Sequence, residues 1–181
     1  MGNRGLTHFL HTGGVIAYPT ESVFGLGCDP SNRTAVHRVL KIKGRPQRKG
    51  LILIASDISQ LSPYIAPLTT EQEARLAQSS TLRPYTWVVP TAADCPRWLT
   101  GQHRSIAVRL TAHPLCRRLC SVSDMALVST SANRSGGRPV KTTRDCLRRF
   151  GSQARVIRGR TGGARRPSTI ADLLTGRILR K

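Results

Sequence analysis

Short apolar runs alternate with longer amphipathic stretches along the chain, which is the pattern of an α/β protein. Runs rich in Val, Ile and Leu predict strands at residues 15–18, 51–55, 85–89, 106–110, 126–129, 155–157, 169–171 and 177–179. Apolar residues at helical spacing predict helices at residues 3–11, 32–43, 69–78, 114–120 and 142–150. The two kinds of element alternate irregularly, so we expect an α/β fold with a twisted, mixed parallel and antiparallel sheet flanked by helices.

Capping residues mark some of the helix ends. Asn32 can cap the second helix, and Thr69 or Thr70 with Glu73 resembles a capping box. Residues 20–30 are rich in glycine instead, and they predict turns between the first strand and the second helix.

Length and composition narrow the class of protein. A chain of 181 residues without internal repeats or a low-complexity linker predicts a single domain over residues 1–181. The longest fully apolar runs are about five residues, too short to cross a membrane, and the N-terminus lacks the apolar stretch of a signal peptide. The five cysteines are odd in number and irregularly spaced, which favours neither disulfides nor a zinc site. We therefore expect a cytoplasmic protein with no membrane partner and no tightly bound metal.

The chain is strongly basic, with 29 Lys and Arg against 9 Asp and Glu and a net charge of +20. Residues 91–181 carry 19 of the cations and 4 of the acids, and Arg outnumbers Lys by 24 to 5. The positive electrostatic potential of such a chain attracts polyanions, and the planar guanidinium group of Arg suits phosphate recognition. Aromatic residues make up only 4%, so base stacking is not the main mode. We expect a tRNA or other RNA to contact a basic face through its backbone.

Two segments carry the strongest chemical signals. Lys43, Arg45 and Lys49 stand directly before the apolar run at 51–55, and such cations can serve a polyphosphate at a strand end. They can equally be a solvated helix C-terminus, which favours cations. The second segment follows the run at 126–129 with small polar side chains at alternate positions. These are Ser129, Ser131 and Asn133, which suit an adenylate phosphate or ribose and are also ordinary turn formers.

Three further positions are candidates for a binding site. Thr20 and Glu21 follow Pro19 and could form a pocket edge or a plain turn. Arg109 lies inside an apolar strand, and because acids are scarce we expect its partner to be a ligand carboxylate or phosphate. Ser168 follows a glycine-rich loop that also carries Arg165 and Arg166. The chain contains no P-loop, dinucleotide fingerprint, His-Glu-x-x-His motif or carboxylate cluster, so a mechanism based on positioning and charge stabilisation remains.

Taken together, these segments resemble the YrdC/TsaC family of threonylcarbamoyl-AMP synthases, in its short bacterial form. The matching segments keep their order and spacing from about Gly14 onward, at residues 15–29, 43–46, 49–53, 129–133 and 167–169. The resemblance implies a YrdC-like fold with a basic concave face. It also implies that L-threonine, bicarbonate and ATP give L-threonylcarbamoyladenylate and pyrophosphate. A partner transferase complex then modifies adenosine 37 of tRNAs that read ANN codons.

The resemblance also implies roles for individual residues. Lys43 and Arg45 would be catalytic, and the nucleotide would be held by Lys43, Arg45, Lys49, Ser129, Ser131 and Asn133. Threonine would be held by Thr20, Arg109 and Ser168. Magnesium would be carried with ATP as part of the substrate rather than held by a protein metal site.

The chain departs from the family pattern at two places. Arg83 stands where a glycine is common, within residues 82–87, and Lys49 stands where many members have histidine. Two other functions remain open at this point. One is a non-catalytic RNA-binding protein that assists rRNA or tRNA maturation, and the other is a carbamoyl transferase-like module that uses carbamoyl phosphate. The combination of Thr20, Arg109, Ser131 and Asn133 favours the synthase, because a pure RNA binder does not need all four.

Overall fold

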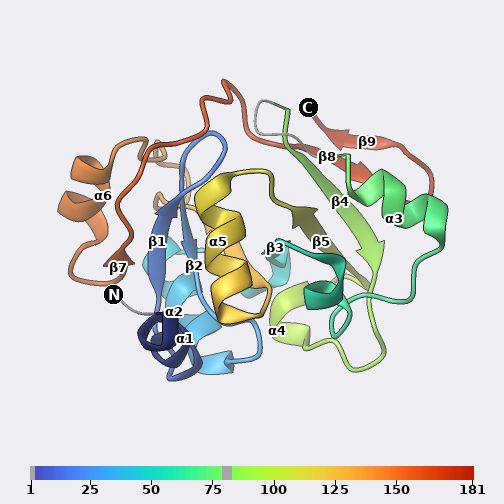
Figure 1. The fold of residues 1–181 in the computed structure, drawn as a ribbon, viewed down its shortest axis with the longest axis horizontal. Helices are drawn as coiled ribbons and strands as arrows, with labels where there is room; N and C mark the ends of the chain where they lie inside the picture. Colours follow the sequence, from blue (N-terminus) through green and yellow to red (C-terminus); the bar gives the residue numbers. More distant parts are fainter. Residues whose placement is uncertain (1–2, 79–82) are drawn as a thin grey trace.

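A computed structural model describes residues 3–78 and 83–181, which form a nine-stranded sheet covered by helices (Figure 1). The strand order is β7-β1-β2-β6-β3-β5-β4-β8-β9. The strands are β1 (Ile16–Pro19), β2 (Phe24–Gly27), β3 (Ile52–Ala55), β4 (Tyr85–Pro90), β5 (Ser105–Leu110), β6 (Leu127–Ser131), β7 (Arg155–Val156), β8 (Thr169–Asp172) and β9 (Ile178–Arg180). The helices are α1 (Asn3–His11), α2 (Arg33–Lys43), α3 (Thr70–Leu76), α4 (Arg97–Thr100), α5 (Pro114–Ser123) and α6 (Thr143–Phe150), with short 3-10 turns η1 (Gln47–Lys49) and η2 (Ile58–Leu61).

The sheet mixes parallel and antiparallel pairs, as the sequence predicted. Parallel pairs join β1 to β7, β3 to β5 and β4 to β8, and the remaining neighbours are antiparallel. Apolar side chains cover both faces. One cluster, which includes Ile16, Tyr18 and Leu127, packs under α1 and α5; in Figure 1, α5 lies in front of the sheet and α1 lies at the lower end of β1. The larger cluster includes Val36 and Val39 of α2 on the opposite face.

The ends of α2 place the first charged segment. The Asn32 side chain accepts a hydrogen bond from the Ala35 N–H and caps the helix, as predicted. Gly44 closes it in the left-handed region at φ 62°, and its N–H donates to carbonyls of the last turn. Lys43 is therefore the last helical residue, and the chain turns sharply before Arg45. The capping box of α3 is also present, but it pairs Thr69 with Gln72 rather than with Glu73.

The prediction that residues 20–30 contain only turns was wrong, because Phe24–Gly27 form β2 between β1 and β6. Its glycines reflect close approach of the neighbouring strands rather than a turn. A Cβ added at Gly27 would lie 2.3 Å from the Val128 carbonyl oxygen and 2.9 Å from a ring carbon of Tyr18. The short helix α4 and both 3-10 turns were not predicted either, because each is too short to show a hydrophobic period.

No helix among residues 3–78 and 83–181 is long and apolar enough to cross a membrane.

Replacing Gly27 by alanine tests the close approach of β2 to β6. We expect Gly27→Ala to lower the free energy of unfolding by about 2 kcal/mol, because the added methyl group meets backbone that cannot move without disturbing the strand pairing. Urea unfolding monitored by circular dichroism measures this change. Gly136→Ala is the control, since nothing lies within 4 Å of its Cβ position and only its φ of 82° opposes the change. A loss no larger than that of the control would contradict the packing argument.

Candidate functional site

A cavity of about 510 Å³ opens on one face of the sheet. Its floor is a row of paired positions across four strands, Ser129 of β6, Ile52 of β3, Ala107 of β5 and Val88 of β4. Because neighbouring residues in register project to the same face, this row creates a continuous surface. Of the predicted site residues, the cavity is lined by Thr20, Lys43, Arg45, Lys49, Arg109, Ser129, Ser131 and Ser168.

Lys43 joins the end of α2 to the end of β6. Its Nζ donates to the Ser131 carbonyl oxygen at 2.6 Å and the Ser131 Oγ at 3.0 Å. It also lies 3.3 Å from the Asn133 carbonyl oxygen and 3.0 Å from the Asn133 Oδ1. The residue is only 4% exposed, and burial, followed by the nearby Arg45 cation, lowers the pKa of Lys43 to about 8. The functional interpretation of the charged segment therefore fits better than a solvated helix end.

Arg45 and Lys49 form the adjoining wall. The Arg45 Nε donates to the Gly50 carbonyl oxygen at 2.9 Å, and its Nη2 donates to the Lys49 carbonyl oxygen at 3.2 Å. These bonds to the η1 turn fix the guanidinium, whose remaining N–H groups stay available, and partial burial lowers the pKa of Arg45. Lys49 itself is exposed at the end of η1 and lines the cavity.

The second polar segment divides into two parts. Ser129 and Ser131 lie at alternate positions on β6 and both line the cavity, as predicted. Asn133 follows the strand and is not among the lining residues. Its Oδ1 accepts from the Ser131 Oγ at 2.6 Å and from Lys43, while its Nδ2 donates to the Arg134 and Gly137 carbonyl oxygens. Asn133 thus positions Lys43 and Ser131 from behind.

Arg109 has protein partners, which corrects the expectation that only a ligand would pair with it. Its Nη1 lies 2.9 Å from the Glu21 Oε2, and its Nη2 donates to the Ser168 Oγ at 2.9 Å. Its Nε and Nη2 also approach the Thr86 Oγ1 at 3.0 and 2.9 Å. The small number of acids in the sequence does not determine where each one lies, and one of them, Glu21, lies opposite Arg109.

Glu21 lies beneath the cavity rather than at its edge, since it is 1% exposed and is not a lining residue. Its Oε1 accepts from the Thr111 hydroxyl at 2.7 Å. Burial alone would raise the pKa of Glu21, but the Arg109 guanidinium and the Thr111 hydroxyl outweigh it and hold the pKa below its usual value. Glu21 is therefore ionised at neutral pH and orients Arg109.

Thr20 and Ser168 complete this end of the cavity. The turn at Thr20 closes through its N–H and its hydroxyl, both of which donate to the Val23 carbonyl oxygen. The Ser168 Oγ accepts from the Thr86 hydroxyl at 2.8 Å and from Arg109, so it has a defined position. The strand predicted at residues 85–89 did not identify Thr86 as a site residue. Thr86 alternates along this strand with Tyr85 and Trp87, the aromatic residues that pack in the core.

Arg180 and Leu179 of β9 also line the cavity, and sequence reasoning did not identify them. The Arg180 Nη2 donates to the Ser168 carbonyl oxygen at 2.9 Å. Burial, and then the like charge of Arg109, lowers the pKa of Arg180. The only signal in the sequence was a cation next to an apolar run near the end of the chain.

Of the two departures from the family pattern, Lys49 lines the cavity and Arg83 does not. Trp87 is buried in the core, and Tyr85 stacks on it with a centroid distance of 5.4 Å, so neither lines the cavity. Arg83 lines a separate pocket of about 440 Å³ with Arg165 and Arg166. Leu82, the first residue of the 82–87 segment, lies outside the described residues.

The described cysteines and acids make no metal site. Within the described ranges, no group of three or more His, Cys, Asp or Glu side chains could hold a metal ion. All five cysteines are free thiols, four of them buried, and burial raises the pKa of each. None of them lines the cavity.

Comparison with known proteins identifies a family whose sequences match this chain. The Sua5/YciO/YrdC family model, described as telomere recombination, matches residues 8–181. A threonylcarbamoyl-AMP synthase of Methylobacillus flagellatus is 58% identical over 99% of both chains. Another of Thiobacillus denitrificans is 51% identical over 97% of this chain and 93% of its own.

Solved structures share the fold. Sua5 of P. abyssi complexed with L-threonine superimposes with a TM-score of 0.84 at 29% identity, over 95% of this chain. This chain spans about half the length of that protein, 51%. YciO of E. coli superimposes with a TM-score of 0.80 at 24% identity over 99% of this chain and 90% of its own. With a family model over nearly its whole length and curated relatives above half identity, the chain belongs to the Sua5/YciO/YrdC family.

Proposed function

We propose that the protein is a threonylcarbamoyl-AMP synthase, which converts L-threonine, bicarbonate and ATP into L-threonylcarbamoyladenylate, pyrophosphate and water. The observation that carries the proposal is the single cavity wall that joins Lys43, Arg45 and Ser131 at one end to Arg109 and Ser168 at the other. One end suits phosphates and the other suits an amino-acid carboxylate. The names of the 51–58% identical relatives support the same activity.

At the phosphate end, fixed cations meet the charge of the nucleotide. The Lys43 ammonium is held by acceptors on β6, and Arg45 is held by the η1 turn, so neither needs to reorganise as charge develops. We infer that they stabilise the α-phosphate during attack and the pyrophosphate as it leaves. Ser129 and Ser131 offer hydroxyl groups beside them. Magnesium would arrive with the ATP phosphates, since the cavity lining contains no carboxylate.

At the other end, we infer that Arg109, Thr20 and Ser168 bind threonine. Glu21 holds the Arg109 guanidinium through Nη1, and Thr86 and Ser168 hold Nη2. These contacts fix the guanidinium and use four of its five N–H groups, so one N–H on Nη1 and the positive charge remain for a ligand carboxylate. Threonine bound there would place its amino group toward the centre of the cavity. The carbamate formed from it with bicarbonate would then have an oxygen directed at the α-phosphorus.

Pyrophosphate release by the purified protein tests the proposal. With ATP and bicarbonate, we expect release that depends on L-threonine and is weaker with L-serine, which lacks the methyl group. Release that does not depend on threonine, or that depends equally on carbamoyl phosphate, would contradict the proposed reaction.

Lys43→Ala and Arg45→Ala are expected to reduce threonine-dependent pyrophosphate release by about 10²-fold or more, because each removes a fixed cation from the phosphate end. Lys41→Ala, an exposed cation on the same helix, is the matched control and should leave the rate unchanged.

Because the pKa of Lys43 is lowered to about 8, its ammonium is present below that pH and is lost above it. The kcat/KM for ATP should therefore fall as the pH rises through about 8. A pH-independent rate in this range would contradict the role of the Lys43 charge.

Arg109→Lys and Glu21→Gln are both expected to raise the KM for threonine by about tenfold or more and to leave the KM for ATP nearly unchanged.

Glu21→Gln should also cost roughly 3 kcal/mol of stability, because it leaves a mostly buried guanidinium without its counter-charge. The folded-state pKa of Glu21 is lowered, so this stabilisation is complete above about pH 4 and is lost as the pH falls through the folded value. The difference in unfolding free energy between the two proteins should therefore shrink in acid. Asp145→Asn, which breaks an exposed ion pair with Arg148, is the control and should cost under about 1 kcal/mol.

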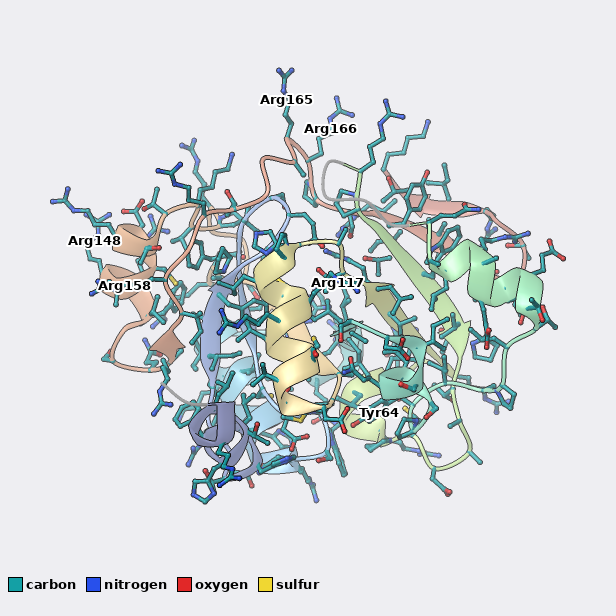
Figure 2. All side chains as sticks on the ribbon, viewed as in Figure 1. Tyr64, Arg117, Arg148, Arg158, Arg165 and Arg166 are labelled. Carbon is teal, nitrogen blue, oxygen red and sulfur yellow. The ribbon has the colours of Figure 1, made fainter. Side chains whose placement is uncertain are left out.

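We also propose that RNA contacts the basic surface outside the cavity. Residues 134–166 carry eleven Lys and Arg and a single acid, Asp145. In Figure 2, Arg148 and Arg158 extend outward near α6 and β7, and Arg165 and Arg166 extend from the loop that leads to β8. This arrangement supports contact with an RNA backbone, and delivery of the product to a transferase that acts on tRNA is consistent with it.

If so, the affinity for unmodified tRNA should fall steeply with salt, as phosphate contacts release counterions. Arg148→Glu with Arg158→Glu should weaken binding in a filter or gel-shift assay without changing pyrophosphate release. Lys43→Ala should reduce pyrophosphate release without changing the affinity for tRNA. If the cavity variant lost tRNA binding while it kept turnover, the RNA-binding protein would become the better description.

A further inference from the structure

The hairpin formed by β8 and β9 gathers most of the exposed large apolar side chains. Four such side chains are exposed among the described residues, and three of them belong to this hairpin. Leu174 in its turn is 53% exposed, and Ile178 and Leu179 of β9 are 46% and 47% exposed. The fourth, Leu147, lies on α6, at the opposite side of the molecule in Figure 1. A cluster of this kind on one element marks an interaction surface more often than chance exposure does.

β9 is also an open edge. It pairs with β8 on one side and ends the strand order of the sheet, and no strand among residues 3–78 and 83–181 pairs with its other side. An edge strand presents backbone N–H and C=O groups that can pair with a further strand. Two of the three exposed apolar side chains, Ile178 and Leu179, therefore lie on the open edge strand itself.

The charge around this edge is mostly positive. Arg177, Arg180 and Lys181 flank the exposed apolar pair, and all three are exposed. The hairpin also contains one acid, Asp172, whose Oδ1 accepts from the Thr175 N–H and hydroxyl and whose charge interacts with Arg177. A second copy of this chain would bring these cations against their equivalents, in a molecule that already carries +20. An acidic strand meets the same groups with favourable charge.

The hairpin also lies next to the cavity. Leu174 lines a shallow groove of about 430 Å³ with Val88, Val89 and Pro90 of β4 and with Arg104. His103 lines both this groove and the 510 Å³ cavity. Leu179 and Arg180, on β9 itself, line the cavity as well. A strand bound along β9 would therefore reach the cavity mouth.

We propose that β9 is a docking edge for an extended segment of a partner protein in which acidic and apolar residues alternate. The segment adds to the sheet beyond β9. Its apolar side chains pack on Ile178, and its carboxylates pair with Arg177 and Lys181. This inference depends on the hairpin alone and stands apart from the proposed reaction.

The test uses a synthetic peptide of about eight residues with alternating valine and glutamate, added to the ¹⁵N-labelled full chain. We expect saturable amide shifts concentrated at residues 173–181. A peptide of the same composition with a central proline should bind much more weakly, because proline removes a ladder donor. This comparison separates strand addition from simple charge attraction.

Variants outside the cavity lining test the surface itself. Ile178→Asp and Arg177→Glu should each weaken the peptide by about fivefold or more while leaving threonine-dependent pyrophosphate release unchanged. The matched controls are Leu147→Asp, the exposed leucine of α6, and Arg118→Glu, an exposed arginine of α5, which should leave binding unchanged.

Three results would overturn the proposal. The first is the absence of saturable shifts, and the second is equal binding of the proline-interrupted peptide. The third is concentration-dependent dimerisation that Ile178→Asp abolishes in sedimentation velocity, which would identify a second copy as the occupant.

Discussion

The buried ammonium of Lys43 is the interaction on which the rest of the site depends. The end of α2 and the segment at residues 131–135 meet at Lys43, whose ammonium donates to acceptors of Ser131 and Asn133. The Ser135 N–H joins the same elements by donating to the Lys43 carbonyl oxygen. Each of those acceptors would cost free energy if buried without a donor. The ammonium in turn loses hydration and is left with a lowered pKa. The same contacts therefore hold β6 against α2 and keep a charge ready at the phosphate end of the cavity.

The Arg109 end uses the opposite arrangement. There the cation has a counter-charge, Glu21, buried beneath it, and two hydroxyl groups fix its remaining edge. Pairing costs less in desolvation than an isolated charge, and it fixes direction as well as position. The backbone of the 158–167 segment strengthens this wall, since the Gly162 and Ala164 N–H groups donate to the Thr20 and Glu21 carbonyl oxygens. One end of the cavity thus holds a cation, Lys43, among neutral acceptors, and the other holds a cation, Arg109, that a buried carboxylate and two hydroxyl groups fix in place.

Much of this could be predicted from the sequence where local rules decide the structure. Asn32, Gly44 and the apolar runs specify α2, β3 and β5 through capping and hydrophobic periodicity. β2 was missed because Gly25 and Gly27 look like turn formers, and only the neighbouring strands show that they are needed for close packing. The pairing of Arg109 with Glu21 joins residues 88 positions apart, and composition carries no information on such distances. Thr86 and Arg180 were missed for the same reason, because parallel and antiparallel pairing brings them to Ser168.

The burial of the thiols has a consequence for the chemical fate of the product. A carbamoyl adenylate is a mixed anhydride, which thiolates and free amines attack readily. All five thiols have raised pKa values and none lines the cavity, so the protein presents no thiolate to it. Among the described residues, the amines of the cavity lining are those of Lys43 and Lys49, and below about pH 8 the lone pair of Lys43 is occupied by a proton. Apart from Lys43, Lys49 and His103, the polar side chains of the lining are hydroxyl and guanidinium groups, which are weak nucleophiles, so few groups of the wall could be acylated by a reactive intermediate bound there.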